Sequence, residues 1–129
     1  NFAVSPGWSD LCWQKATSLE LPFFPGILTP TELMHALHSG CLNPKIFPIA
    51  PVGGVQYLKS LLAPFRKYSI KCLPTGGIGR NMVPNYLSDP HVSMVGGSWI
   101  TSEDLVSKKD FAGITELAKS SLFLANNKE

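Results

Sequence analysis

Short apolar segments alternate with longer amphipathic segments along the whole chain. We expect β-strands at the apolar segments, over Phe2–Ser5, Leu21–Phe24, Lys45–Phe47, Ile70–Leu73 and Val92–Val95. Near-continuous apolar runs are typical of parallel strands that are buried on both faces. The connections of about ten to twenty residues between them suit crossover helices. The pattern therefore predicts an α/β fold with a parallel sheet.

Helical spacing of apolar residues predicts four helices. They cover residues Thr31–Ser39, Gly54–Leu62, about Asn81–Leu87 and about Phe111–Leu124. The first has the clearest start, because Thr29 is placed to cap it and Glu32 completes a T-x-x-E capping box. Its expected inner face consists of Leu33, Met34, Leu37 and His38.

Composition and charge narrow the class of protein. The 129 residues are 44% hydrophobic and 16% charged, which predicts one folded domain. A formal net charge of +2 is too small to indicate a nucleic-acid partner, and no basic run suggests a membrane partner. Cys12, Cys41 and Cys72 have no metal-ligand spacing, so we expect buried thiols in a cytoplasmic protein with no metal or cofactor.

Each predicted strand ends in a turn rich in proline or glycine. In α/β folds the carboxyl ends of parallel strands carry the active site. One such turn is common in any α/β protein, but five in succession are less so. The segments Thr75–Ile78 and Gly96–Trp99, TGGI and GGSW, end consecutive strands. Glycine-rich backbone can present N–H groups to an anion, so these two loops predict a phosphate site that a Cβ would crowd.

Lys45 opens the third predicted strand and has two interpretations. By residue type alone, a solvated lysine at a strand start is the more common one. If Lys45 lies in apolar surroundings, however, the pKa of its amine falls toward neutrality. A neutral amine can attack a ketone and form a Schiff base.

Eight short motifs, taken together and in this order, carry a resemblance to a known family. They begin at Phe2 (FAVSPG), Leu21 (LPFFPG), Thr31 (TELM), Lys45 (KIFP), Gly53 (GGV), Pro64 (PF), Pro74 (PTGGI) and Val95 (VGGSW). They closely resemble the 2-keto-3-deoxy-6-phosphogluconate (KDPG) and 4-hydroxy-2-oxoglutarate (KHG) aldolases. The resemblance implies a (β/α)8 TIM barrel and a homotrimer. It also implies reversible cleavage of a phosphorylated keto acid to pyruvate and glyceraldehyde 3-phosphate.

The resemblance also implies roles for individual residues. Lys45 matches the Schiff-base lysine, while Pro6 and Phe47 match positions in the pyruvate pocket and Thr75 a position beside the substrate chain. The residues that match the phosphate site are Gly76, Gly77, Gly97 and Ser98. Ile46 and the pair Ile49-Ala50 depart from the usual family residues, without affecting the lysine.

The five predicted strands match the last five strands of the family barrel. We therefore expect residues 1–129 to form the C-terminal five-eighths of a single barrel domain within a longer polypeptide. The family's acid/base glutamate, carboxylate-binding arginine and a threonine lie on the first three βα units, which have no counterpart here. Two alternatives stay open: an aldolase for 4-hydroxy-2-oxoglutarate or the phosphogalactonate epimer, and a non-catalytic phosphate-binding half-barrel or structural subunit.

Overall fold

The computed structural model describes residues 1–126, in which five short strands pair in parallel. The strands are β1 (Ala3–Val4), β2 (Phe23–Phe24), β3 (Gly26–Ile27), β4 (Lys45–Ile46) and β5 (Leu73–Pro74). β1 pairs with β2, and β3, β4 and β5 pair in that order. Pro25 separates β2 from β3, so the segment 23–27 contacts β1 along its first half and β4 along its second.

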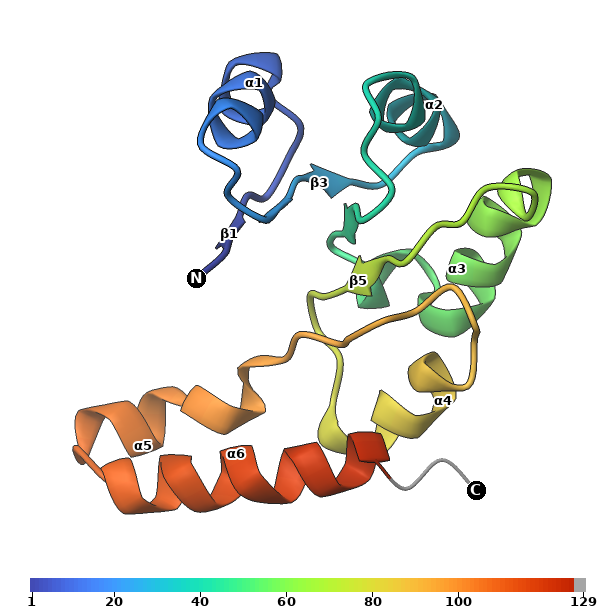
Figure 1. The fold of residues 1–129 in the computed structure, drawn as a ribbon. Coiled ribbons are helices and arrows are strands. Elements are labelled where there is room, and N and C mark those ends of the chain that lie inside the picture. The colour runs from blue at the N-terminus through green and yellow to red at the C-terminus, as the bar shows by residue number, and fades with distance from the viewer. Residues whose placement is uncertain (127–129) are drawn as a thin grey trace.

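Residues 1–126 contain six helices. They are α1 (Asp10–Ser18), α2 (Pro30–His38), α3 (Gly54–Leu62), α4 (Val83–Leu87), α5 (Glu103–Ser107) and α6 (Phe111–Asn126). Figure 1 shows α1, α2, α3 and α4 following one another around the outer side of the strands, while α6 packs against α4. Single 3-10 turns occupy residues 50–52, 63–65, 80–82 and 98–101.

The hydrophobic core lies between the strands and these helices. Ile46 of β4 is completely buried, together with Leu33 and Ala36 of α2 and Leu58 of α3. Tyr86 brings α4 into the same core. Burial of side chains of this size stabilises the fold by about 1.5–3 kcal/mol each, so the core fixes which face of β4 meets the helices.

The structure corrects the strand predicted over Val92–Val95. This segment forms a single parallel bridge, between Val92 and Cys72, and no ladder. It still follows β5, because the N–H groups of Ser93 and Gly96 donate to the carbonyls of Cys72 and Pro74. Pro74 has no N–H to return a bond, so continuous pairing beside it is interrupted. The strand predicted over residues 70–73 likewise moves to 73–74.

The structure also locates a helix and corrects a helix face. α1 lies between the first two predicted strands, where the spacing suits a crossover helix, but its bounds were not predicted because it buries only Ala16 among its nine residues. Its usable signal was Ser9, whose side chain accepts a hydrogen bond from the Cys12 N–H. In α2 the buried residues are Leu33 and Ala36, whereas Met34, expected inside, is 49% exposed.

The three cysteines are free and differ in environment. Cys12, predicted to be buried, is exposed, because α1 turns it away from the core. Cys41 and Cys72 are buried as predicted. Burial raises the pKa of Cys41 to about 11 and, with the nearby charge of Asp89 adding to it, the pKa of Cys72 to about 12. Both buried thiols are therefore protonated at neutral pH.

An apolar groove separates α1 from β1. It has a volume of about 400 Å³, and Leu11, Cys12 and Leu21 are among the residues that line it. Close by, the side chains of Phe2 and Val4 are 65% and 49% exposed. Within residues 1–126, no helix is both long enough and apolar enough to cross a membrane.

The capping box of α2 generates a stability prediction. The Thr29 hydroxyl accepts from the Glu32 N–H, and the Glu32 carboxylate accepts from the N–H groups of Leu28 and Thr29. Thr29→Ala should lower the free energy of unfolding by about 1 kcal/mol, because the helix start loses its side-chain cap. Urea denaturation at neutral pH measures this loss. Thr31→Ala, an exposed change within the same helix turn, should leave stability nearly unchanged.

The pH dependence of this effect follows from Glu32. Desolvation raises the pKa of Glu32, but the hydrogen bonds from the backbone N–H groups of Thr29 and Leu28 outweigh it and hold the pKa below 4.5. The contribution of Glu32 is thus complete above pH 4.5 and is lost as the pH falls through the lowered pKa. A Thr29→Ala protein as stable as the parent at pH 7 would contradict the role of the box.

Candidate functional site

Lys45 and Phe47 lie on the face of β4 opposite to the core. Side chains alternate along a strand, and Ile46 between them is fully buried under the helices. Hydrogen bonds hold β4 on both sides, from the Lys45 N–H to the Pro25 carbonyl and from the Thr75 N–H to the Ile46 carbonyl. The lysine Nζ lies 4.3 Å from the centroid of the Phe47 ring. The Phe47 ring therefore packs against one side of the Lys45 amine.

The surroundings of Lys45 disfavour its charged form. Its side chain is half-buried, and it forms no ion pair with a carboxylate of the described residues. Desolvation lowers the pKa of Lys45 below 10.5. This is the direction that the sequence predicts for a lysine in apolar surroundings. A larger fraction of the amine is therefore neutral, and nucleophilic, than in a solvated lysine.

Gly26 brings the loop after β1 against the lysine strand. Gly26 pairs with Lys45 across β3 and β4. A Cβ on Gly26 would lie 2.1 Å from the Pro6 carbonyl oxygen, so the Pro6 backbone rests directly on this residue. Pro6, a predicted pocket residue, is thus one strand away from Lys45. Sequence reasoning missed Gly26, although a glycine that follows Pro25 at a strand end was the available signal.

The loop after β5 closes over Phe47 from the other side. The N–H groups of Ile49 and Ala50 donate to the carbonyls of Thr75 and Gly76 at 2.9 and 3.0 Å. Gly76 has a φ of +92°, and a Cβ there would lie 2.9 Å from the Phe47 ring. The positive φ and the close ring contact both require glycine at this position. Phe47, Thr75 and Gly76, which the resemblance assigns to the site, therefore lie close together.

Thr75 carries a buried hydroxyl without a partner. Its Oγ1 is inaccessible to solvent, and no described residue hydrogen-bonds it. A buried hydroxyl that lacks a partner costs about 1–3 kcal/mol. Gly96 lies against it, since a Cβ on Gly96 would be 2.2 Å from the Thr75 methyl carbon. In this rotamer the hydroxyl is closed off from solvent, so a hydrogen bond to a bound molecule requires rotation of the Thr75 side chain.

The glycine loops differ from expectation in one respect. The Cβ direction of Gly97 is filled by the Trp99 indole, with a carbon at 1.4 Å, and that of Gly77 points at Ala50. The steric need for glycine thus comes from the protein and not from a phosphate. The backbone still suits an anion, because the N–H groups of Gly76, Gly77 and Gly97 have no acceptor within residues 1–126. Ser98 is exposed at the start of the 3-10 turn 98–101.

The structure connects most of the predicted site residues by direct contacts. A continuous path runs from Pro6 over Gly26 to Lys45 and Phe47, and from there to Gly76 and Thr75. Gly77 and Gly97 flank this path, whereas Ser98 has no recorded contact with the lysine. Among the described residues, no group of three or more histidine, cysteine or acidic side chains is placed to hold a metal ion.

Comparison with known proteins identifies a family of related sequences. The family model described as KDPG and KHG aldolase matches residues 1–117. The 2-dehydro-3-deoxy-phosphogluconate aldolase of Dickeya dadantii is 38% identical over 94% of this chain and 56% of its own length. The KHG/KDPG aldolase of Escherichia coli is 36% identical, over 94% of this chain and 56% of that protein. The chain therefore spans a little over half the length of these relatives.

Two solved structures match the fold closely. One is the KDPG aldolase from Legionella pneumophila with pyruvate captured as a covalent carbinolamine intermediate. It has a TM-score of 0.83 and 37% identity, over 93% of this chain and 57% of that one. The other is the KDPG aldolase of Zymomonas mobilis with 3-phosphoglycerate. It has a TM-score of 0.82 and 36% identity, over 93% of this chain and 55% of that one. The α/β fold described above is thus the fold of these aldolases.

The contact between Gly26 and Pro6 can be tested by a matched pair of glycine variants. Gly26→Ala places a Cβ 2.1 Å from the Pro6 carbonyl, and overpacking of this kind typically costs 1–3 kcal/mol of unfolding free energy. Gly7→Ala, in the same loop, meets nothing within 4 Å and should be close to neutral. Thermal and urea unfolding compare the two. Equal stability of both variants would show that the loop after β1 does not rest on Gly26.

Proposed function

Because the chain belongs to the KDPG and KHG aldolase family, we propose that the protein is a class I aldolase acting through a Schiff base on Lys45. The proposed reaction is the reversible cleavage of 2-keto-3-deoxy-6-phosphogluconate to pyruvate and glyceraldehyde 3-phosphate. The observation that carries the proposal is the half-buried Lys45 amine over the Phe47 ring, with a pKa lowered by desolvation. Such an amine can act as the nucleophile of an aldehyde lyase, and this covalent step requires no metal ion.

The proposed chemistry uses the lysine as an electron sink. The neutral Lys45 amine adds to the C2 ketone to give a carbinolamine, which loses water to form an iminium. A base removes the C4 hydroxyl proton, the C3–C4 bond breaks, and its electron pair enters the iminium to give an enamine and the aldehyde. Protonation of C3 and hydrolysis then release pyruvate and restore the lysine. A carbinolamine of pyruvate is the species named in the Legionella pneumophila relative.

The other site residues have supporting roles in this proposal. Pro6 and Phe47 border the pyruvate moiety, and the Thr75 hydroxyl, which lacks a protein partner, turns toward the substrate chain by side-chain rotation. The unpaired N–H groups of Gly76, Gly77 and Gly97, together with the Ser98 hydroxyl, bind the phosphate. These N–H groups favour a phosphorylated substrate over 4-hydroxy-2-oxoglutarate. The Escherichia coli relative carries both activities in its name, so the second substrate is the alternative within the family.

The proposal also includes the architecture around the site. The chain would supply about the last five βα units of a (β/α)8 barrel, and the first three units would carry the acid/base carboxylate. The matched share of the relatives, a little over half, supports this division. We expect the protein to form a homotrimer and to lie in the cytoplasm. Light scattering of the purified protein would test the oligomeric state. A non-catalytic phosphate-binding half-barrel is the alternative from another class of protein. An adduct on Lys45 in the trapping experiment below would argue against it, and the absence of any adduct would favour it.

Incubation with pyruvate and borohydride should place a stable adduct on Lys45. Peptide mass mapping locates the adduct. The trapping rate should rise with pH and level off with a midpoint below 10.5, because desolvation lowers the pKa of this amine. The same shift makes charged Lys45 destabilising. That cost is fully present below the folded-state pKa and disappears as the pH rises toward 10.5, since the unfolded state binds more protons in this window.

Three variants sharpen this test. Lys45→Ala should lose the adduct and almost all aldol cleavage. Lys45→Arg should not restore either, because a guanidinium stays protonated and is not a nucleophile. Lys67→Ala, which removes an exposed lysine elsewhere, serves as the matched control and should keep full trapping. An adduct on Lys59 or Lys71 with Lys45 unmodified would overturn the assignment.

The phosphate role is best tested at Ser98. Ser98→Ala should raise the KM for the phosphorylated substrate roughly ten-fold, the effect of one lost hydrogen bond to a charged group, with little change in kcat. The KM for 4-hydroxy-2-oxoglutarate should not change. Ser107→Ala, on α5, is the control. Gly97→Val is the poorer test because its Cβ meets Trp99 first. Equal losses on both substrates would argue against a phosphate contact.

A further inference from the structure

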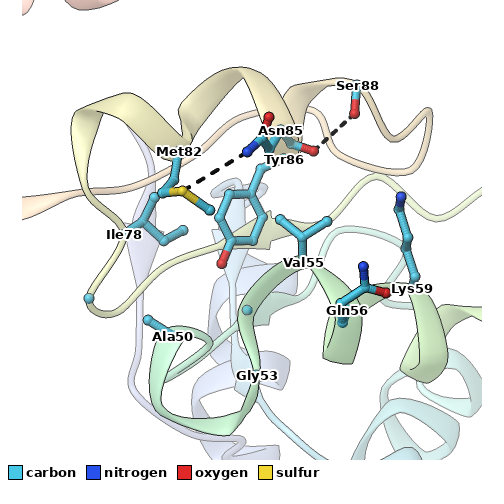
Figure 2. Close-up of a pocket in the computed structure, with 12 residues that line it drawn as sticks. Ala50, Gly53, Val55, Gln56, Lys59, Ile78, Met82, Asn85, Tyr86 and Ser88 are labelled. Atoms are coloured by element: carbon cyan, nitrogen blue, oxygen red, sulfur yellow. Dashed lines mark hydrogen bonds between the residues drawn. The ribbon is translucent and has the colours of Figure 1, made fainter.

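A second cavity lies between α3 and α4, away from the Lys45 side chain. It has a volume of about 590 Å³, and its walls come from the start of α3, the loop after β5 and the inner side of α4. Figure 2 shows Ala50, Gly53 and Val55 on one side of it and Ile78 and Tyr86 on the other. Lys45 does not line this cavity. Of its lining residues, the mechanism proposed above uses Gly77 alone.

The nine-residue helix α3 enters this cavity with an uncapped N-terminus. Its N-cap is Gly53, which has a φ of +116° and no side chain to accept a hydrogen bond. Within residues 1–126, no acceptor is recorded for the N–H groups of Val55 and Gln56. Unpaired N–H groups in the first turn and the positive end of the helix dipole together favour a bound anion.

The hydroxyl of Tyr86 is a second, independent indication of a ligand. Tyr86 is only 2% exposed, and its hydroxyl has no hydrogen-bond partner among the described residues. Figure 2 shows the ring extending from α4 with this hydroxyl directed at the start of α3. A Cβ on Gly54 would lie 3.1 Å from the oxygen, so the hydroxyl and the helix N-terminus face the same space.

From this juxtaposition we propose that the cavity is a second phosphate-binding site, which borders the substrate loop at Gly77 but uses different donors. The Tyr86 hydroxyl and the N–H groups of Val55 and Gln56 are the donors, and the ammonium of Lys59 lies on the rim. The ligand is a phosphate group, either inorganic phosphate or the phosphate of a small monoester.

The charge of the cavity supports an anion over a cation. Lys59 is the charged residue of its lining, and neither an aspartate nor a glutamate contributes to it. Burial raises the pKa of Tyr86, so the phenol stays protonated and donates a hydrogen bond. Gly77, which belongs to the loop after β5, also lines the cavity. Binding through Gly77, Gly97 and Ser98 alone is therefore the competing location for a phosphate.

Titration of the purified protein with inorganic phosphate tests the proposal, by calorimetry or by phosphorus NMR. Tyr86→Phe keeps the ring and removes the donor, so it should weaken phosphate binding roughly ten-fold, as expected for one hydrogen bond to a charged group. Lys59→Gln changes an exposed residue, so folding should be unaffected. It should weaken phosphate binding less than Tyr86→Phe does, and its effect should be larger at low salt than at high salt. Glycerol phosphate as a second probe distinguishes a monoester ligand, which would bind more tightly, from free phosphate.

Controls separate this site from the aldolase centre. Tyr68→Phe and Lys67→Gln alter an exposed tyrosine and an exposed lysine outside the cavity and should not affect binding. Pyruvate trapping on Lys45 should be unchanged in Tyr86→Phe, so a failure of the proposed function would show separately. Parental phosphate affinity in both Tyr86→Phe and Lys59→Gln would overturn the proposal. Complete loss of binding in Ser98→Ala would also do so, because it would place the phosphate on the substrate loops alone.

Discussion

The site depends on the alternation of side chains along β4. Ile46 is fully buried between the strands and the helices. Because side chains alternate along a strand, the neighbouring Lys45 and Phe47 must point to the opposite face. Hydrogen bonds to β3 on one side and to the loop after β5 on the other hold the strand in register. A shift by one residue would exchange an apolar side chain for a lysine in the core. The position of the amine is therefore fixed by packing on the opposite face.

Much of the fold could be predicted because its signals are local. Thr29 and Glu32 identify the start of α2 in the sequence, and the structure shows the same capping box. Where prediction failed, distant residues decided the outcome. Val92–Val95 reads as a strand, but its neighbour Pro74 cannot donate a hydrogen bond, and no property of the segment itself reveals this. The bounds of α1 were not predicted because its contacts with the core are few.

The sequence indicates which residues lie near Lys45 better than it explains why each residue type is required there. The Lys45 amine and Gly76 both lie against the Phe47 ring, and Thr75 directly precedes Gly76. Sequence could not show that Trp99 fills the space beside Gly97, since that depends on the path of the chain over two residues. Gly26 was overlooked for a similar reason. Its role comes from the backbone of Pro6, about twenty residues earlier, and long-range backbone contacts leave no periodic pattern.

The unequal environments of the three cysteines make the chain suitable for site-specific labelling. Maleimides and iodoacetamides react with thiolates that they can reach. Cys41 and Cys72 are buried, and their raised pKa values keep them protonated, whereas Cys12 is exposed on α1. Among the three cysteines of residues 1–129, a fluorophore or spin label would thus attach at Cys12. Because Cys12 borders the groove beside β1, the spectrum of a label on Cys12 would change when a polypeptide lies along that strand.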